Sequence, residues 1–495
     1  MKLSSATLAD LPEGVIRPEY PRNETSIGMV HIGVGGFHRA HQAIYTEQLL
    51  NLGHATQWRI CGAGVRSADK AMKDALAAQD YLYTLCELDE SDNTAIQIVG
   101  AIADFLLVDE DHQALLDRLS SPDTRIVSLT VTEGGYFTDD SSGEFKTSDP
   151  AIVRDLENPT SPMTMVGLIA EGLFRRRAAG IKPFTVMSCD NLPHNGDVAR
   201  KAVLSYAALR DKALHDWINA EVSFPNGMVD RITPMTSDQH RQQLEARTGI
   251  IDAWPVVAEP FLQWVLEDKF CNGRPEWERV GVQFTDDVTP YEEMKIGLLN
   301  GGHLAMTFLG TLLGYEYAHE VMADELLSNY VRDYMDKDVT PLLSDVPGID
   351  LSEYKDTLIQ RFSNRAICDQ LTRICSDAAA KFPKFVLPTL RGQIKRGMPL
   401  DRTALIIAAW THYLQGVDEA GREYPILDPQ LSLLRQTVAE PALIVPGMLA
   451  IEDVFGQDLG ESDAFVSAFS EQLLRLQTLG VHQTLKLLSS SISRK

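Results

Sequence analysis

The hydrophobic pattern of this chain changes character past its middle. In the first part, short apolar, β-branched runs alternate with amphipathic stretches, at 27–32, 58–61, 96–99, 125–131 and 183–188. This alternation predicts β-α-β units around a parallel sheet that helices cover on both faces. From about Lys295 the 3.6-residue periodicity of helices dominates. It runs over six segments: 295–315, 321–336, 366–380, 402–415, 442–453 and 463–479.

The change of period predicts the domain boundary. It falls within VQFTDDVTPYEE, residues 282–293, where Pro290 is the local breaker of regular structure. A chain of 495 residues is longer than one typical domain. We therefore expect two domains, 1–286 and 287–495, the first built on a parallel sheet and the second mainly helical.

Charge and composition limit the partners. The chain has 45 Lys and Arg against 69 Asp and Glu, a net charge of −24, so it repels nucleic acid and anionic membrane surfaces. Its six cysteines are far apart, as expected of reduced thiols in a reducing compartment. No run of about 18 apolar residues and no apolar leader is present. These features predict a cytoplasmic protein with a small-molecule partner, no nucleic acid and no membrane.

A glycine-rich turn follows the first apolar run, in VHIGVGGFHRAHQAIYTEQLL, residues 30–50. In a dinucleotide-binding fold the first glycine makes the turn from strand to helix, and the second lets the backbone approach a pyrophosphate. The third glycine of G-x-G-x-x-G falls on His38, so an ordinary glycine-rich β-α turn remains equally open. The candidate cofactor contacts here are Gly33, Gly35, Gly36 and Phe37.

Charged residues follow the second apolar run, WRICGAG. An acid in this position accepts the adenosine ribose hydroxyls and favours NAD, which makes Asp69 a candidate. Arg66 could instead meet a 2′-phosphate, so NADP remains open as a weaker cofactor. Asp69 could equally cap the following helix.

Two later strand ends also carry polar residues. SLTVTEGGY, residues 128–136, ends in Thr132 and Glu133, and MSCDNLPHNG, residues 187–196, contains Asn191. Doubly wound sheets bind ligands at strand ends, so Thr132 and Glu133 are candidate cofactor contacts and Asn191 a candidate donor to a substrate oxygen. Glu133 as a solvated turn residue, and an Asx turn at Asp190 or Asn191, are the alternatives.

The segment YEEMKIGLLNGGHLA places Lys295, Asn300 and His303 on one broad helix face. A buried lysine without a carboxylate partner can act as a general base. Asn300 and His303 can then donate to an oxygen on which negative charge grows. The adjacent glycines at 301–302 cost roughly 1 kcal/mol each in a helix, so something approaches this backbone closely. A surface lysine beside a core Asn–His hydrogen bond is the alternative.

Two further patterns carry less weight. Tyr291 and Lys295 match the Y-x-x-x-K pair of short-chain dehydrogenases, but that pair lies inside a single nucleotide domain, whereas here it lies at a domain junction. We interpret the match as coincidence. His38 and His41 have metal-ligand spacing without an acidic or cysteine cluster nearby, so we expect no metal site.

Beyond these single motifs, nearly the whole chain resembles the polyol-specific long-chain dehydrogenase/reductases, the mannitol dehydrogenase family. The resemblance rests on GVGGFHRAHQAIY, SLTVTEGGY, FTVMSCDNLPHNG, FPNGMVDRITP, EPFLQWVLEDKF, TPYEEMKIGLLNGGHLA and RFSNRAICDQLTRICSDAAAKFPKF. It implies an α/β fold class, with a Rossmann-type N-terminal domain on a parallel sheet and a mainly α-helical C-terminal domain. It also implies a monomer and metal-independent hydride transfer between NAD and a polyol or ketose, D-mannitol and D-fructose.

The resemblance also implies roles for single residues. Lys295 becomes the base and His303 orients and polarises the reacting oxygen, which Asn191 and Asn300 hold. The substrate's distal hydroxyls contact Asp230, Arg373 and Lys381, and the adenosine ribose contacts Asp69. Gly302 departs from the serine or other polar residue usual in the family. Because Arg373 and Lys381 could also grip a carboxylate, a reductase of hexuronates such as fructuronate is the first alternative. A non-catalytic nicotinamide-binding regulator is the second.

Overall fold

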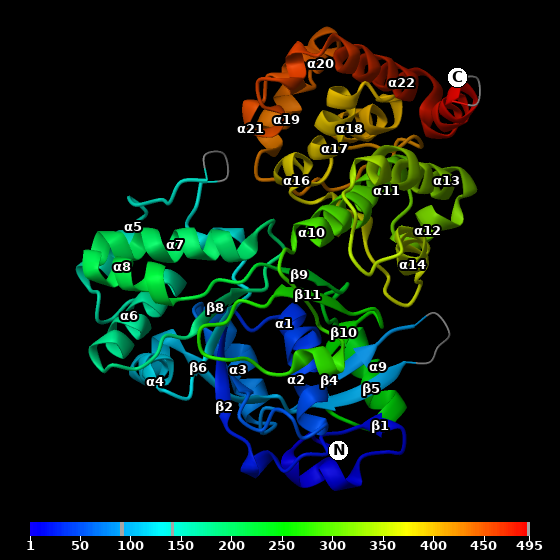
Figure 1. Ribbon diagram of the computed structural model, residues 1–495. Helices are drawn as coiled ribbons and strands as arrows, with labels where there is room; N and C mark the ends of the chain where they lie inside the picture. Colours follow the sequence, from blue (N-terminus) through cyan, green and yellow to red (C-terminus); the bar gives the residue numbers. More distant parts are fainter. Residues whose placement is uncertain (90–93, 140–142, 493–495) are drawn as a thin grey trace. The chain divides into compact units, whose positions relative to one another are not determined.

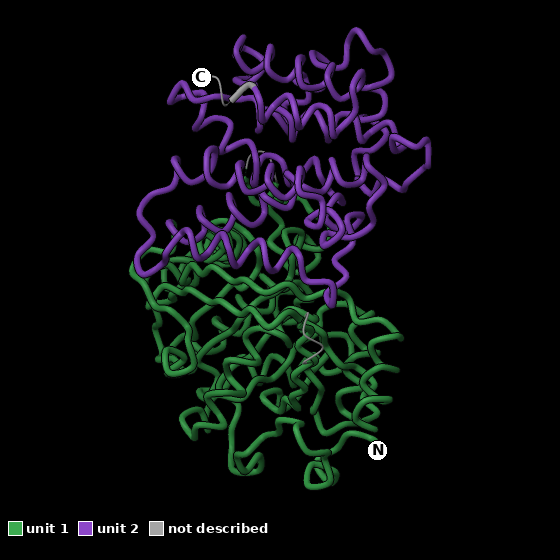
Figure 2. The backbone as a smooth tube through the Cα atoms, turned by 90° about the vertical axis from the view of Figure 1, so that its right-hand side faces the viewer, with its two compact units in different colours: residues 1–289 green, residues 290–495 purple. Residues whose placement is uncertain are grey.

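The computed structural model describes residues 1–89, 94–139 and 143–492 of the chain. The chain divides into two compact units, Met1–Thr289 and Pro290–Lys495, coloured separately in Figure 2. Among the described residues, no helix is both long and apolar enough to cross a bilayer.

Unit 1 is built on a five-stranded sheet (Figure 1) in which every strand pair is parallel. The strands, in spatial order, are β6 (Ile102–Leu107), β3 (Arg59–Gly64), β2 (Ile27–Ile32), β7 (Ile126–Leu129) and β8 (Thr185–Ser188). This is the order of a doubly wound sheet, and it confirms the predicted α/β fold. The strand order reverses between β2 and β7, where such sheets bind ligands at the carboxyl ends of their strands.

Helices join these strands and bury both faces of the sheet. Met29 and Val30 alternate along β2 and belong to two different apolar cores, as the period of a strand requires. The helices of unit 1 are α1 (Gly36–Ala40), α2 (Gln42–Asn51), α3 (Lys70–Ala77), α4 (Val108–Ser120), α5 (Pro150–Glu157), α6 (Met165–Ala178), α7 (Asn195–Arg210), α8 (Lys212–Glu221) and α9 (Asp238–Thr248).

Two smaller sheets complete unit 1. One has the order β1 (Val15–Ile16), β5 (Ala95–Val99), β4 (Tyr83–Glu87) and β10 (Val256–Ala258). The other has the order β12 (Gln283–Thr285), β11 (Gln263–Glu267) and β9 (Gly227–Asp230). The run at 96–99 was expected in the parallel sheet, and this was wrong. It pairs antiparallel with β4, because the connection between β4 and β5 has too few residues for a parallel crossover.

Unit 2 is helical. Its helix α11 (Gly301–Leu312) packs on α13 (Glu325–Tyr334), α15 (Leu371–Cys375) and α18 (Asp401–Tyr413), and α18 packs on α22 (Asp463–Ile492). The aromatic core stacks Phe382 on Trp410, with ring centroids 4.4 Å apart, and Phe308 lies beside both Phe382 and Tyr413. The remaining helices are α10 (Thr289–Lys295, which begins at the unit boundary), α12 (Ala318–Ala323), α13 (Glu325–Tyr334), α14 (Leu351–Ser363), α15 (Leu371–Cys375), α16 (Ala378–Phe385), α17 (Leu387–Arg396), α18 (Asp401–Tyr413), α19 (Leu431–Thr437), α20 (Ile444–Leu449), α21 (Glu452–Phe455) and α22 (Asp463–Ile492).

Two expected helices are interrupted. The segment 366–380 contains α15 and the start of α16, separated at Asp377, whose φ of 52° is left-handed and whose N–H donates to Leu427 O. The segment 442–453 is divided between α20 and α21. Apolar periodicity continues through such breaks because both pieces face the same core, so it could not place them.

A buried ion pair in unit 2 provides a test of the fold. Asp338 accepts hydrogen bonds from Arg402 and Gln393, and all three side chains are buried. Asp338→Ala leaves a buried guanidinium without its partner, so we expect a loss of about 3–5 kcal/mol in the free energy of unfolding. Urea denaturation measures it. The exposed pair Asp333–Lys337 is the control, since Asp333→Ala should cost less than about 1 kcal/mol. Equal losses in the two variants would contradict the expectation.

Candidate active site

The turn after β2 accepts only glycine at its first position. Gly33 has φ +92°, and a Cβ built there would lie 2.1 Å from the carbonyl oxygen of Thr130. Gly35 precedes α1 and differs, because a Cβ there would meet only Gly33 O, at 3.8 Å. A Cβ on Gly36 would make ordinary contacts with Thr233 and Val256. Gly33 is thus required by the protein's own packing, whereas Gly35 leaves open backbone at the end of the strand.

A series of hydrogen bonds fixes this turn. Thr130 Oγ1 donates to Gly33 O at 2.6 Å and lies 2.9 Å from His31 Nε2. His31 Nδ1 lies 2.8 Å from Ser128 Oγ, which donates to Gln42 Oε1 at 2.9 Å. Burial lowers the pKa of His31 to about 3, so its imidazole ring is neutral near pH 7.

His38 occupies the place of the third glycine. Its ring stacks on His31, with centroids 3.4 Å apart. Burial, then the nearby charges of His31 and Arg39, lower the pKa of His38 well below its usual value. A flat, neutral ring thus replaces the close glycine contact between helix and strand. The other candidate in this turn, Phe37, is partly buried and stacks on His41 at 4.9 Å.

The end of β3 places Arg66 and Asp69 together. Asp69 is buried, accepts a hydrogen bond from Arg66 N at 3.2 Å and pairs with the Arg66 guanidinium at 3.2 Å. The Asp69 side chain makes no capping hydrogen bond to α3, the helix that follows it. Its carboxylate therefore organises the 66–69 turn at the sheet edge where the fold binds the adenosine of a dinucleotide.

Asp190, which sequence analysis considered only for an Asx turn, joins the ends of β7 and β8. Its carboxylate accepts from Val131 N at 3.1 Å, Thr132 N at 2.9 Å and Tyr136 Oη at 2.6 Å. Burial raises the pKa of Asp190, and these hydrogen bonds oppose that shift. Asp190 thereby positions the two loops that carry Thr132, Glu133 and Asn191. These three candidates are exposed.

Asp230 ends β9 and is buried, in the same unit as Asn191. Its negative charge acts on His41, whose Nε2 lies 2.9 Å from Gln263 O and whose pKa burial lowers to about 4. The loop that carries Asn191 continues to His194, which borders a polar cavity of about 600 Å³ in unit 1. No signal in the sequence pointed to this cavity.

In unit 2, a π-helical turn separates the predicted base from its neighbours. Lys295 ends α10, residues Ile296–Asn300 form the turn η6, and α11 follows. Lys295 is buried, with 5% of its surface exposed. The regular spacing of 100° per residue that the sequence predicts therefore does not hold across this segment. π turns of this kind occur often at functional sites.

Asn300 and His303 offer unfilled hydrogen-bonding atoms. Within the described part of the chain, neither Asn300 Oδ1 nor His303 Nε2 has a hydrogen-bond partner, although both atoms are buried. The alternative was a core hydrogen bond between Asn300 and His303. A bond between these two atoms would satisfy both, and neither is satisfied. Such atoms are costly to bury unless a ligand or water satisfies them.

Positive charge gathers around His303. Burial first, then the charges of Arg373, Arg361, Lys381 and Lys295, lower its pKa well below the usual value. His303 is therefore neutral at physiological pH. The structure brings together all five unit 2 candidates, and it adds Arg361, which the sequence analysis missed. Arg373 is also paired with Asp369 at 2.6 Å, and Lys381 Nζ donates to Ile374 O at 3.0 Å.

The double glycine after Asn300 has a structural explanation. A Cβ on Gly301 would lie 2.8 Å from Tyr334 Oη and 3.1 Å from Phe385 O, and one on Gly302 would lie 2.8 Å from Met335 Cε. The close approach predicted from the sequence is therefore made by neighbouring helices of unit 2. Tyr291, the other member of the Y-x-x-x-K match, donates to Pro347 O at 2.8 Å.

No group of three or more His, Cys, Asp or Glu side chains in the described residues is arranged to hold a metal ion. All six cysteines are free thiols.

The doubly wound sheet, its glycine turn and the acid after β3 define a dinucleotide-binding protein of the Rossmann class. The model of the mannitol dehydrogenase Rossmann domain matches residues 27–279, and that of the mannitol dehydrogenase C-terminal domain matches residues 287–477. The chain belongs to the mannitol dehydrogenase family.

Individual relatives agree over nearly the full length. Mannitol 2-dehydrogenase of Aspergillus fumigatus is 41% identical, and the match covers 98% of each chain. The structure of Pseudomonas fluorescens mannitol 2-dehydrogenase in ternary complex with NAD and D-mannitol is 57% identical, with a TM-score of 0.92 over 99% of this chain and 100% of that one. A substrate-free D-sorbitol dehydrogenase is 40% identical, with a TM-score of 0.89 over 98% and 100%.

The two glycines of the turn should respond differently to alanine. Gly33→Ala should lower the melting temperature, because of its positive φ and the clash with Thr130 O. Gly35→Ala should leave the melting temperature unchanged but weaken NADH binding, because its methyl group meets no crowded protein atom and fills space left for the pyrophosphate. Thermal melts and fluorescence titration with NADH measure both. Unchanged NADH affinity in Gly35→Ala would refute the cofactor role of the turn.

Proposed function

We propose that this chain is an NAD-dependent polyol dehydrogenase that interconverts D-mannitol and D-fructose by hydride transfer at C2. The observation that carries the proposal is the 57% identity, over 99% of this chain, with a mannitol 2-dehydrogenase whose structure contains NAD and D-mannitol. The residues of the glycine turn and of the His303 cluster have the chemistry that this reaction needs.

The cofactor residues are those of unit 1. The open backbone at Gly35 and Gly36 fits a pyrophosphate, and the buried Asp69 carboxylate fits the adenosine ribose hydroxyls. The proposal adds Phe37, Arg66, Thr132 and Glu133 as flanking contacts. When bound, NAD supplies the acceptor for the hydride that leaves C2.

Lys295 is the proposed general base. Lys295 is buried, and only the neutral form of its amine accepts the proton of the C2 hydroxyl. The Asn300 Nδ2 amide and the His303 Nε2–H, whose Nε2 has no partner among the described residues, then donate to the oxygen as its negative charge grows. Asn191 is the second proposed amide donor. Because an amine takes the proton and neutral donors polarise the oxygen, this step needs no metal.

The remaining substrate contacts are assigned on the family resemblance. Asp230, Arg373 and Lys381 bind the hydroxyls distant from C2. A second candidate function is the reduction of a hexuronate such as fructuronate. The observation that favours it is the charge around His303, where Arg361, Arg373 and Lys381 together could hold a carboxylate. We also propose that the protein acts as a monomer in the cytoplasm, consistent with its six unpaired thiols.

A substrate panel tests the function. NADH or NADPH is mixed with D-fructose, fructuronate or no sugar, and absorbance at the nicotinamide band is followed. We expect NADH to be consumed fastest with D-fructose. Faster consumption with fructuronate would select the second candidate, and no consumption with any sugar would indicate a non-catalytic nicotinamide-binding regulator. In the oxidative direction, D-mannitol is compared with sorbitol and arabinitol.

Lys295→Ala tests the mechanism. Loss of a general base should lower kcat by about 10²–10⁴-fold while the affinity for NADH stays near that of the unchanged protein. Tyr291→Phe is the control, because its hydroxyl donates to Pro347 O, and it should keep nearly full turnover. Equal losses in both variants would instead support the Y-x-x-x-K interpretation.

The pH dependence should identify the same group. Protonation disables a base, so the rate of mannitol oxidation should fall about tenfold per pH unit on the acid side of one titration. His303 cannot cause this titration near neutrality, because burial and its cationic neighbours hold its pKa well below the usual value. Steady-state rates from pH 5 to 10 measure the profile. A flat profile across that range would contradict Lys295 as the base.

A further inference from the structure

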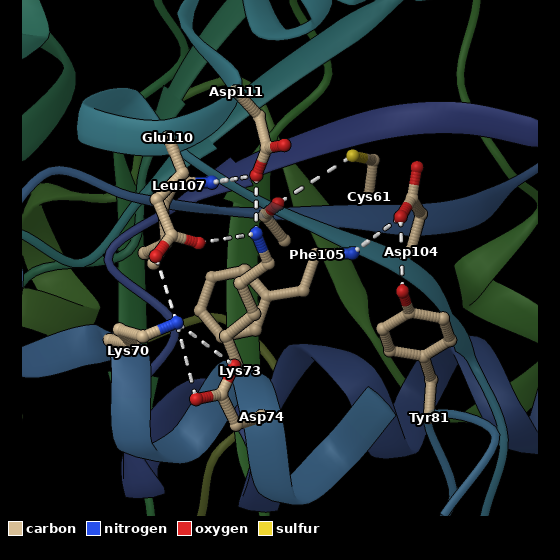
Figure 3. Close-up of polar contacts among 11 residues, drawn as sticks. Cys61, Lys70, Lys73, Asp74, Tyr81, Asp104, Phe105, Leu107, Glu110 and Asp111 are labelled. Carbon is tan, nitrogen blue, oxygen red and sulfur yellow. Dashed lines mark hydrogen bonds and ion pairs between the residues drawn. The ribbon is translucent and has the colours of Figure 1, made fainter. Parts of the chain in front are cut away.

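A dense set of ion pairs lies at the carboxyl ends of β3 and β6, between α3 and α4 (Figure 3). Lys70 Nζ lies 2.8 Å from Glu110 Oε1, and Lys73 Nζ lies 3.1 Å from Glu110 Oε2. Lys73 also pairs with Asp111, and Lys70 with Asp74 at 3.3 Å. Carboxylates in the first turn of α4 thus pair with both Lys70 and Lys73. These lysines belong to α3, the helix that follows the 66–69 turn.

The turn itself is engaged in the same way. Ser67 Oγ donates to Asp109 Oδ2 at 2.8 Å, and the Arg66 guanidinium pairs with Asp69. The side-chain donors of this corner are those of Arg66, Ser67, Lys70 and Lys73, and each has a carboxylate partner. Five carboxylates surround three cations, so the corner is net negative: Asp69, Asp74, Asp109, Glu110 and Asp111 against Arg66, Lys70 and Lys73.

This corner is where the two nicotinamide cofactors differ. Doubly wound sheets bind the adenosine ribose just after their second strand, which here is β3. NADP carries an additional 2′-phosphate of charge about −1.5 to −2 there, and it needs free cationic or hydroxyl donors. Pairing with Lys70 lowers the pKa of the Glu110 carboxyl, and pairing with Glu110 raises the pKa of the Lys70 amine, so both stay charged at neutral pH.

We propose that Asp109 and Glu110 on the first turn of α4 are specificity-determining residues that exclude NADP. They hold the Ser67 hydroxyl and the Lys70 and Lys73 amines, and they add negative charge beside the ribose. Asp69 selects for the ribose diol, whereas this second pair of carboxylates acts by occupying the donors that a 2′-phosphate would use. The inference rests on the proposed binding of a nicotinamide dinucleotide by unit 1.

The test compares two isomers by calorimetric titration of the full chain: ADP, whose second phosphate extends the 5′-phosphate, and 2′,5′-ADP, whose second phosphate is on the 2′-oxygen. In Asp109→Asn/Glu110→Gln, two negative charges are removed, and Ser67, Lys70 and Lys73 lose these carboxylate partners, while Lys70 keeps Asp74 and Lys73 keeps Asp111. We expect 2′,5′-ADP to bind about tenfold tighter or more than to the unchanged protein, with ADP changed less than about twofold. The preference for NADPH over NADH in fructose reduction should shift in the same direction.

The control is Asp117→Asn/Asp123→Asn, which removes the same charge at and beyond the opposite end of α4. Asp117 lies eight residues from Asp109, which is about 12 Å along a helix. This distance exceeds one Debye length at 0.1 M salt, so the affinity for neither ligand should change more than about twofold. The single variants Asp109→Asn and Glu110→Gln are made alongside, so that the result is read from them if the double variant does not fold.

Three outcomes would overturn the inference. The first is unchanged 2′,5′-ADP affinity in folded variants, and the second is equal tightening of ADP and 2′,5′-ADP, which would indicate general attraction for anions. The third is tightening in the Asp117→Asn/Asp123→Asn control. Failure of the unchanged protein to bind ADP or NADH would overturn the proposed function, and this inference with it.

Discussion

The position of the β2 turn depends on one hydrogen bond, from Thr130 Oγ1 to the carbonyl of Gly33. This bond joins two neighbouring strands at the point where the order of the sheet reverses. It continues through the buried side chains of His31 and Ser128, so one series of hydrogen bonds connects the turn with the core. The open backbone beside Gly35 is therefore presented by a rigid support.

Much of unit 1 could be predicted from the sequence, and the two exceptions have different causes. Four of the five expected apolar runs are strands of the parallel sheet, because buried strands require continuous apolar residues. The fifth, at 96–99, has the same composition but pairs with a neighbour too close in sequence for a parallel crossover. Asp190 looked like a local turn residue, since its partners at 131–136 are more than fifty positions away and no local pattern marks them.

Unit 2 shows a similar limit. The sequence placed Lys295, Asn300 and His303 on one face by counting regular turns, but η6 interrupts the regular helix between them. The cations that surround His303 come from α14, α15 and α16, so helical periodicity near residue 300 contained no information about them. Residue-by-residue resemblance named two of those cations, Arg373 and Lys381. Arg361 became visible only through packing.

The pairing of β2 with both β3 and β7 has a consequence for synthesis of the chain. After β2 has been synthesised, the ribosome must add about a hundred more residues before Thr130 can donate its hydrogen bond to Gly33 O. Until then the nascent segment exposes an unpaired strand edge, which is the kind of surface that chaperones cover. Stalling or truncation before β7 would thus release a product prone to aggregate, whereas interruption after residue 289 would leave unit 1 with its three sheets complete.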